Sequence, residues 1–255
     1  MQNGEQILTT LLEMSRNLGK PENDYIILGE GNTSAKIDDK TFWVKASGAS
    51  LSSLEPENLV KVSFEKTLTL LKQSNLTDEE IREGLKNVRI DQDVKAMPSV
   101  ETFMHAVLLQ FDGVNFIGHT HPTAINAILC SRNAAEALSG SLFPDQIVYC
   151  GAEYVFIPYT DPGFILANTV YKTTQDFYER WGQAPKVIYM QNHGFIALGG
   201  TAKDVENITA MAVKSARIIA GTYAMGGPNF LSPKSVDRIH TRPDEQYRKK
   251  VWGTR

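Results

Sequence analysis

The sequence predicts one α/β domain over residues 1–255, built on a mixed or mainly antiparallel sheet. Helix-like and strand-like segments are interleaved along the chain. Several consecutive strands are joined by turns too short for the crossover that parallel neighbours need. No repeat, low-complexity tract or long linker divides the chain, and 42% hydrophobic residues are enough for a sizeable core.

The periodicity of apolar residues and the positions of turn residues give the expected elements. Helices are expected over residues 3–18, 77–88, 100–110, 123–131, 161–180 and 201–224, with two short helices after them. Strands are expected over residues 33–38, 41–46, 114–120, 146–149, 154–157, 186–191 and 194–198. The expected helix caps are Ser99, Asp161 before Pro162, and Thr201 with Asp204 in a capping box. The polar stretch 73–96 is the expected mobile surface segment.

Composition narrows the class of partner. A net charge of −3 gives no reason to expect a nucleic acid or an anionic membrane. No window reaches the roughly 18 apolar residues of a membrane span, and the first twenty residues lack signal-peptide features. We therefore expect a cytoplasmic protein with no membrane partner. Cys130 and Cys150 are expected to be reduced, small core residues.

The tripeptide His119-Thr120-His121 is the most informative in the chain. Side chains two residues apart on a strand project from one face, so both imidazoles point to one place. Neutral imidazoles suit Zn²⁺, Cu²⁺, Fe²⁺ or Ni²⁺, and a catalytic zinc site needs three protein ligands plus an open position. Two histidines alone are equally well explained as polar residues at a strand end.

A third histidine, His193, changes this balance. It follows the apolar strand ending at Met190 and precedes Gly194, where a bulky side chain would crowd the approach. A lone histidine at such a position is usually structural. Together with the His119 and His121 pair it completes a three-imidazole set, which predicts a metal site.

Glu101 is the candidate acid/base. A glutamate in the first turn of a helix ordinarily complements the helix dipole. If it faces the histidines, it can instead ligate a metal or move protons. His105, one turn further on, is expected to pack or to support the site, Met104 is expected in the core, and His240 carries no signal.

Two small-residue loops, 29–34 and 45–48, are the candidate anion sites. Loops of this kind can present backbone N–H groups and hydroxyls to a phosphate, although many are plain turns. Neither has the spacing of a P-loop or of a dinucleotide fingerprint.

Taken in order, five segments resemble the class II aldolase/adducin family, the group of L-fuculose- and L-rhamnulose-1-phosphate aldolases and L-ribulose-5-phosphate 4-epimerase. The segments are GEGNTSAK, KASGASL, PSVETFMH, GHTHPTA and QNHGFIALGGTAKDVEN. The resemblance covers residues 5–225. It is closest in texture to the aldolase modules that precede a short-chain dehydrogenase in fusion proteins.

The resemblance implies a three-layer α/β/α sandwich around a mainly antiparallel sheet, assembled as a homotetramer. It implies a zinc-dependent aldolase that cleaves a ketose phosphate or related sugar by a retro-aldol reaction through a zinc-stabilised enediolate. One Zn²⁺ per chain would be held by His119, His121 and His193, with Glu101 as acid/base. The positions that match the phosphate-binding residues of the family are Asn32, Ser47, Gly48 and Ser99.

Two departures and three alternatives stay open. Val100 stands where the aldolases have a second hydroxyl, so a different or unphosphorylated substrate is compatible with this chain. A catalytic tyrosine, for which Tyr149 and Tyr154 are the nearest candidates, stays unassigned. The alternatives are a sugar-phosphate 4-epimerase, which tends to carry aspartate in place of Glu101, a non-catalytic adducin-like module, and a metal-dependent hydrolase.

Overall fold

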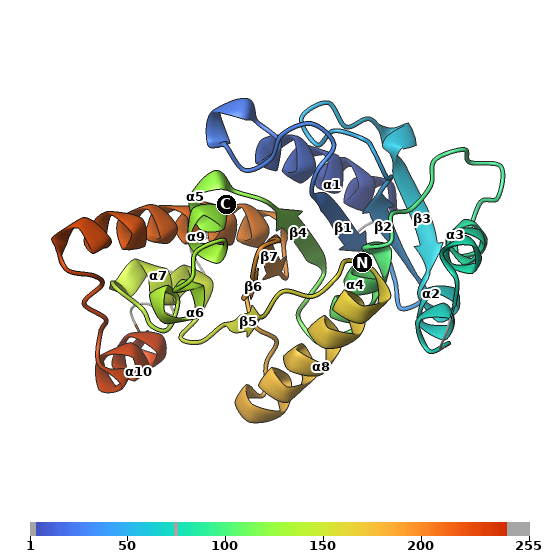
Figure 1. Cartoon of the computed structure of the whole chain (residues 1–255). Coiled ribbons are helices and arrows are strands. Elements are labelled where there is room, and N and C mark those ends of the chain that lie inside the picture. The colour runs from blue at the N-terminus through green and yellow to red at the C-terminus, as the bar shows by residue number, and fades with distance from the viewer. Residues whose placement is uncertain (1–3, 74–75, 244–255) are drawn as a thin grey trace.

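A seven-stranded sheet forms the centre of the computed structural model, which describes residues 4–73 and 76–243 (Figure 1). Its strand order is β3-β2-β1-β4-β7-β6-β5. The strands are β1 (Asn32–Lys36), β2 (Thr41–Lys45), β3 (Leu59–Ser63), β4 (Phe116–Thr120), β5 (Val155–Ile157), β6 (Val187–Met190) and β7 (Gly194–Gly199). All neighbours are antiparallel except β5 and β6. The predicted mainly antiparallel sheet is confirmed.

Helices cover both faces of the sheet. The longer ones are α1 (Gly4–Leu18), α2 (Phe64–Leu71), α3 (Asp78–Asn87), α8 (Phe164–Trp181), α9 (Ala202–Thr222) and α10 (Pro233–Thr241). The shorter ones are α4 (Thr102–Leu108), α5 (Thr123–Leu129), α6 (Ala134–Ala137) and α7 (Pro144–Cys150), with 3₁₀ turns at Pro21–Asn23, Pro56–Asn58 and Tyr223–Met225. On one face α1 and α9 pack on the sheet and α5 and α7 pack on α9, while α2, α4 and α8 cover the other face. This is the three-layer α/β/α sandwich that the resemblance implied.

The alternation of side chains along the strands explains why both faces are covered. In β6, Val187 and Tyr189 enter the core beneath α1 and α9, whereas Ile188 and Met190 enter the core beneath α4 and α8. Neighbouring strand residues point to opposite faces. Since both sets are apolar, each face needs a helical layer to remove it from water.

The expected strand over 146–149 is wrong, because these residues belong to helix α7. Pro144 occupies the first turn of that helix, a position where its missing N–H costs nothing. Periodicity cannot separate a short buried strand from a short buried helix, and the β-branched Ile147 and Val148 favoured the wrong one.

Two helices start later than expected. Helix α4 begins at Thr102 with Glu101 at the N-cap position, so Ser99 is not its cap. Helix α8 begins at Phe164 after Gly163, which adopts a φ of +106° that strongly favours glycine, so Asp161 is not its cap. The expected Thr201–Asp204 capping box is confirmed at the start of α9.

Some of the remaining expectations are confirmed and others are wrong. Strand β3 and helix α2 were not predicted. Cys150 is buried as expected, but Cys130 is exposed, and both thiols are free. Of the two short C-terminal helices, α10 is present, and residues 244–255 lie outside the described part of the chain. No helix within residues 4–73 and 76–243 is both long and apolar enough to cross a bilayer.

Candidate metal centre

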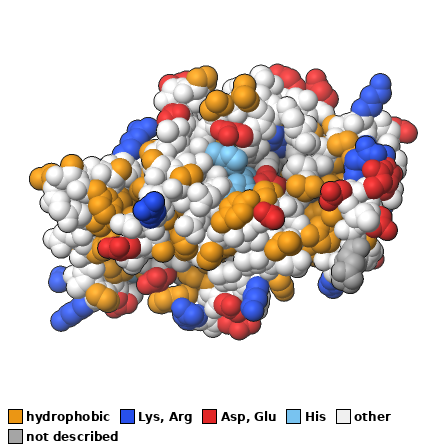
Figure 2. Space-filling model, viewed as in Figure 1, with side chains coloured by type: hydrophobic (Ala, Val, Ile, Leu, Met, Phe, Trp, Pro, Cys, Tyr) orange, Lys and Arg blue, Asp and Glu red, His pale blue; other side chains and the backbone are white. Residues whose placement is uncertain are grey.

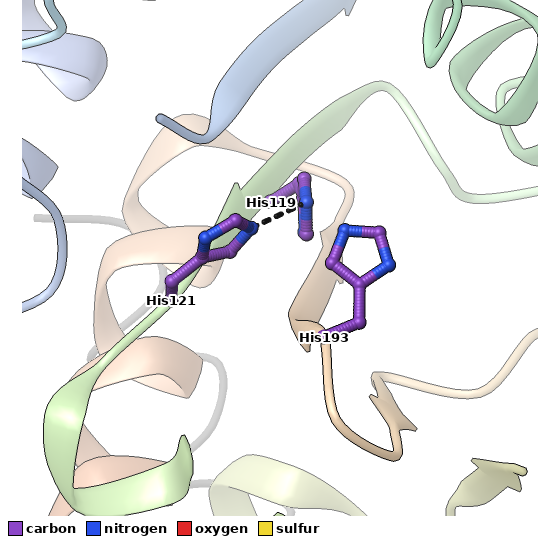
Figure 3. A group of neighbouring side chains, drawn as sticks. All are labelled: His119, His121 and His193. Atoms are coloured by element: carbon purple, nitrogen blue, oxygen red, sulfur yellow. Dashed lines mark hydrogen bonds between the residues drawn. The ribbon is translucent and has the colours of Figure 1, made fainter. Parts of the chain in front are cut away.

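Three histidines meet at one end of strands β4 and β7. His119 lies in β4, His121 follows that strand, and His193 lies in the turn between β6 and β7. Strands β4 and β7 pair antiparallel, with Thr120 opposite Phe195, so the end of one strand meets the start of the other. Figure 3 shows the three rings converging, and their ligand atoms lie within 4.8 Å of one another. Histidine side chains are visible in a hollow of the surface, with acidic and hydrophobic side chains around it (Figure 2).

The glycine after the third histidine is required by this packing. A Cβ added at Gly194 would lie 2.6 Å from His121 Cδ2 and 2.9 Å from the Thr120 carbonyl oxygen. The rings therefore approach the turn more closely than any larger residue permits. The expectation that a bulky side chain would crowd the approach is confirmed.

The hydrogen-bond partners of two rings determine where their lone pairs point. Nδ1 of His119 lies 3.0 Å from the Phe195 carbonyl oxygen, and Nδ1 of His121 lies 3.1 Å from Glu30 Oε2. Neither acceptor carries a hydrogen, so both Nδ1 atoms must donate, a tautomer inferred from the partners. When both rings are neutral, their Nε2 atoms carry lone pairs, yet these two atoms are 3.0 Å apart. Two lone pairs at this distance need a proton or a metal cation between them, so the donor set fits a metal ion.

The carboxylate of Glu101 faces this cluster. Its Oε1 lies 3.2 Å from His193 Nε2 and 3.5 Å from His119 Nε2. Burial by itself would raise the pKa of Glu101, but the two imidazoles hold that pKa well below its usual range. Burial and the neighbouring histidines lower the pKa of His121 to about 3. Burial lowers the pKa of His119, but the charge of Glu101 raises it above its usual value, so this ring gives up its proton when a metal cation binds. Glu101 as an anion and His121 as a neutral imidazole already have the protonation states that bind a metal cation.

A chain of hydrogen bonds runs behind Glu101. Asn32 Nδ2 donates to Glu101 Oε2, Asn32 Oδ1 faces His105 Nε2, and His105 Nδ1 lies 2.6 Å from Ser34 Oγ. Because the carboxylate only accepts, the chain has one direction, from the serine hydroxyl through the imidazole and the amide to Glu101. Burial lowers the pKa of His105 to about 3, which keeps the ring neutral as this direction requires. The expected supporting position of His105 agrees with these contacts.

Lys45, the first residue of the candidate anion loop 45–48, was given no role of its own in the sequence analysis, and its side chain contacts the other candidate loop. The Lys45 ammonium donates to the carbonyl oxygens of Gly29 at 3.1 Å and Ala49 at 2.5 Å. Burial lowers the pKa of Lys45 to about 8, and the negative charge of Glu101 opposes this shift. Its signal in the sequence was a single charged residue ending the strand Thr41–Lys45 directly before a small-residue loop.

The residues expected to bind phosphate lie near one another and near Glu101. Ser47 N donates to the Met97 carbonyl at 2.8 Å, which brings the exposed Ser47 and Gly48 beside the segment containing Ser99. Ser99 Oγ accepts from Glu101 N at 3.2 Å. Asn32 is buried, and its amide is engaged by Glu101 and His105. The phosphate-binding roles of these four residues stay predictions.

Val100 and the two candidate tyrosines, which concern the departures from the family pattern, have defined positions in the structure. Val100 is 40% exposed, and a Cβ at Gly163 would lie 3.9 Å from Val100 Cβ, so the valine faces the loop before α8. The Tyr154 ring packs edge-on against Tyr189 in the core beneath α9, with the two ring centroids 5.1 Å apart. Tyr149 packs against the same core.

Sequence comparison identifies the family. The family described as "Class II Aldolase and Adducin N-terminal domain" matches residues 9–220, and the chain belongs to it. A curated relative, the uncharacterized oxidoreductase YuxG of Bacillus subtilis (strain 168), is 28% identical over 196 residues, which are 74% of this chain. The match spans about a quarter (26%) of that relative's length.

Solved structures share the fold. The N-terminal class II aldolase domain of a conserved protein from Thermoplasma acidophilum aligns with a TM-score of 0.65 and 26% identity, over 84% of this chain and 93% of that one. An L-fuculose 1-phosphate aldolase aligns with a TM-score of 0.69 and 17% identity, over 95% and 96% of the two chains. The fold is therefore that of the class II aldolase/epimerase group.

Proposed function

We propose that this chain is a zinc-dependent class II aldolase that cleaves a ketose phosphate or related sugar by a retro-aldol reaction. The observation that carries the proposal is the position of Glu101, whose carboxylate faces His119 and His193 at 3.5 and 3.2 Å. Three converging imidazoles with an adjacent carboxylate meet the needs of a metal-assisted carbon–carbon cleavage. We expect a non-catalytic adducin-like module to have lost the metal ligands, whereas this chain has all three histidines and the glutamate.

The zinc ion would be held by His119, His121 and His193. When bound, it supplies positive charge where a substrate oxygen becomes negative as the carbon–carbon bond breaks. Glu101 is the residue that moves the proton to and from the reacting carbon. The Asn32 amide, itself held by His105, keeps the carboxylate oriented for this task.

The loops around Lys45 would bind the phosphate of the substrate. The proposed contacts come from Ser47, Gly48 and Ser99, with Asn32 contributing its second amide hydrogen. Holding the phosphate fixes the distance between the reacting carbon and Glu101, which converts an encounter into an oriented reaction. By family resemblance, we also propose a homotetramer as the functional form.

The test combines metal analysis with an activity screen. Elemental analysis should give about one zinc per chain, and a panel of phosphorylated and free ketoses should release aldehyde from at least one member. The Glu101→Gln protein should retain zinc but lose roughly 10²–10⁴-fold in kcat, the usual contribution of a general acid/base. A folded native protein that binds no metal would refute the proposal. Epimerisation of ribulose 5-phosphate without aldehyde release would identify the 4-epimerase instead.

A further inference from the structure

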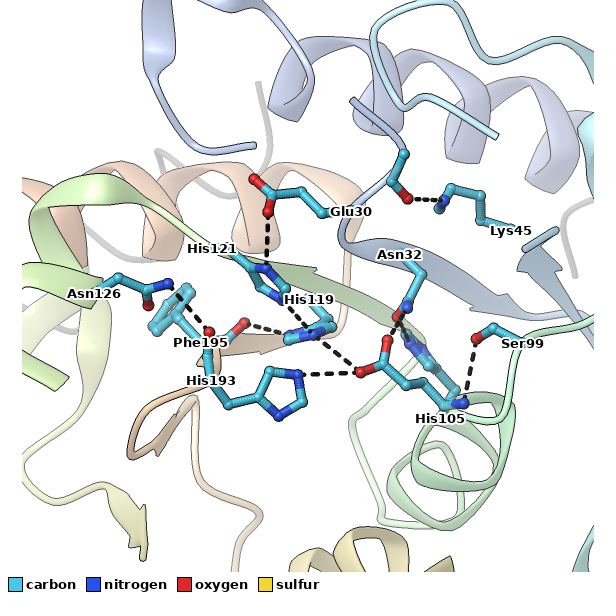
Figure 4. A network of polar contacts seen from close by, with 12 residues as sticks. Glu30, Asn32, Lys45, Ser99, His105, His119, His121, Asn126, His193 and Phe195 are labelled. Atoms are coloured by element: carbon cyan, nitrogen blue, oxygen red, sulfur yellow. Dashed lines mark hydrogen bonds and ion pairs between the residues drawn. The ribbon is translucent and has the colours of Figure 1, made fainter. Parts of the chain in front are cut away.

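A second carboxylate lies against the outer edge of one candidate metal ligand. Glu30 Oε2 is 3.1 Å from His121 Nδ1, on the opposite side of the ring from the Nε2 that faces His119 (Figure 4). Its other oxygen, Oε1, accepts the backbone N–H of Ile27 at 2.6 Å. Glu30 is therefore held by its own turn while it contacts His121.

We propose that Glu30 is a positioning residue of the metal centre, which holds His121 as its Nδ1–H tautomer and directs the Nε2 lone pair toward the ion. The proposal rests on the proposed metal site but not on the reaction carried out there. A carboxylate can only accept from this ring, so the hydrogen must reside on Nδ1. Histidine ligands in proteins are commonly fixed through their outer nitrogen in this way.

Among the described contacts, His119 and His121 have a hydrogen-bond partner at Nδ1 and His193 has none, and His121 is the ring with the most exposure to water. His119 is fully buried and its Nδ1 is held by the Phe195 carbonyl. The His121 side chain is the most exposed of the three at 21%, against 10% for His193. An exposed ring has more rotational freedom to lose when a metal binds, so fixing it beforehand contributes more to affinity.

The charge of Glu30 matters in addition to its geometry. A carboxylate partner raises the basicity of the imidazole more than a neutral carbonyl does. Glu30 and Glu101 together place two negative charges beside a site for a doubly charged ion. These charges offset the desolvation free energy of holding that ion in a partly buried position.

The turn that carries Glu30 is tied to the same ligand. The His121 backbone N–H donates to the Tyr25 carbonyl at 2.9 Å, so segment 25–30 contacts His121 through both backbone and side chain. Within the turn, Leu28 adopts a φ of +53° with its side chain 83% exposed. The left-handed region is unfavourable for leucine, and the Glu30 bond to Ile27 helps to close the turn that imposes it.

The proposal is tested by zinc affinity, measured in competition with a chromophoric chelator on the full chain. Removing the carboxylate in Glu30→Ala should weaken zinc binding by about 10–100-fold, the usual effect of losing a partner of a ligating histidine. Glu30→Gln, which retains an acceptor oxygen without the charge, should recover part of this loss. Glu57→Gln, an exposed glutamate on another turn, and Leu28→Asn, which suits a left-handed residue, should both bind zinc as the wild type does.

Ring nitrogen NMR provides a second readout that does not depend on metal. With five histidines in the chain, the His121 signals can be assigned by substitution, and they should show the Nδ1–H tautomer in the wild type but not in Glu30→Ala. Wild-type zinc affinity in Glu30→Ala, alongside a loss in His121→Ala, would overturn the role of Glu30. A wild-type protein that binds no zinc would instead overturn the proposed function.

Discussion

Gly194 is the position at which one methyl group should disable the candidate metal centre. A Cβ there would lie 2.6 Å from His121 Cδ2 and 3.1 Å from His119 Cε1. Carbon atoms in contact settle about 3.5–4.0 Å apart, so the His121 ring must move by about 1 Å. Metal–ligand distances tolerate only about 0.2 Å. We therefore expect Gly194→Ala to weaken zinc binding by at least about 10–100-fold and to destabilise the fold by about 1–3 kcal/mol.

The matched control is Gly221→Ala. This glycine lies in helix α9, and apart from its chain neighbours and the helix's own backbone no atom lies within 4 Å of an added Cβ. Alanine there should leave zinc affinity unchanged and raise stability by up to about 1 kcal/mol. Both proteins are compared with wild type by chelator competition and by urea unfolding in the metal-free state. A Gly194→Ala protein that folds and binds zinc with wild-type affinity would refute the packing argument.

Two further predictions concern the loops. Val100→Ser restores a hydroxyl beside Ser99, so kcat/KM for a phosphorylated ketose should rise by roughly 10–100-fold, the worth of one hydrogen bond to a charged group, with free ketoses unaffected. An equal change for both substrates would contradict a phosphate contact there. Burial lowers the pKa of Lys45 from an ordinary 10.5 to about 8, so the unfolded chain binds more protons than the folded one between these pH values. The free energy of unfolding should therefore rise with pH across this range, by at most about 3 kcal/mol because solvent screens a partly buried charge. Lys45→Met should lack this rise in urea unfolding from pH 7.5 to 10.5, and parallel profiles for the two proteins would show that Lys45 is not desolvated.

The three histidines could be recognised in the sequence because strand periodicity alone places His119 and His121 on one face. The position of His193 depended on the pairing of β4 with β7, which no local pattern reveals. The contacts of Glu30 and Lys45 could not be predicted either, because no local sequence pattern reveals them. Each depends on which loops meet in space, and a charged residue in a loop is usually a solvated one.

The secondary structure was also predicted correctly in some parts of the chain and wrongly in others. Long elements with strong periodicity, such as α9 with its buried Val205, Ile208 and Ala212, were predicted correctly. The errors fall on short apolar segments and helix starts, where several signals compete. At residues 146–149 the β-branched side chains outweighed Pro144, and before α8 the positive φ of Gly163 overrode a good capping residue at Asp161.

The antiparallel pairing of β4 with β7 makes the metal centre a late product of folding. An unfolded chain offers an ion only the local pair His119 and His121, since His193 is far along the chain and closing so large a loop is entropically costly. The third ligand arrives only when the central strands have found their register, with Thr120 opposite Phe195. During refolding, the ion should therefore be bound by all three rings at the same rate as the sheet assembles. Metal binding can then be used to follow the assembly of the sheet.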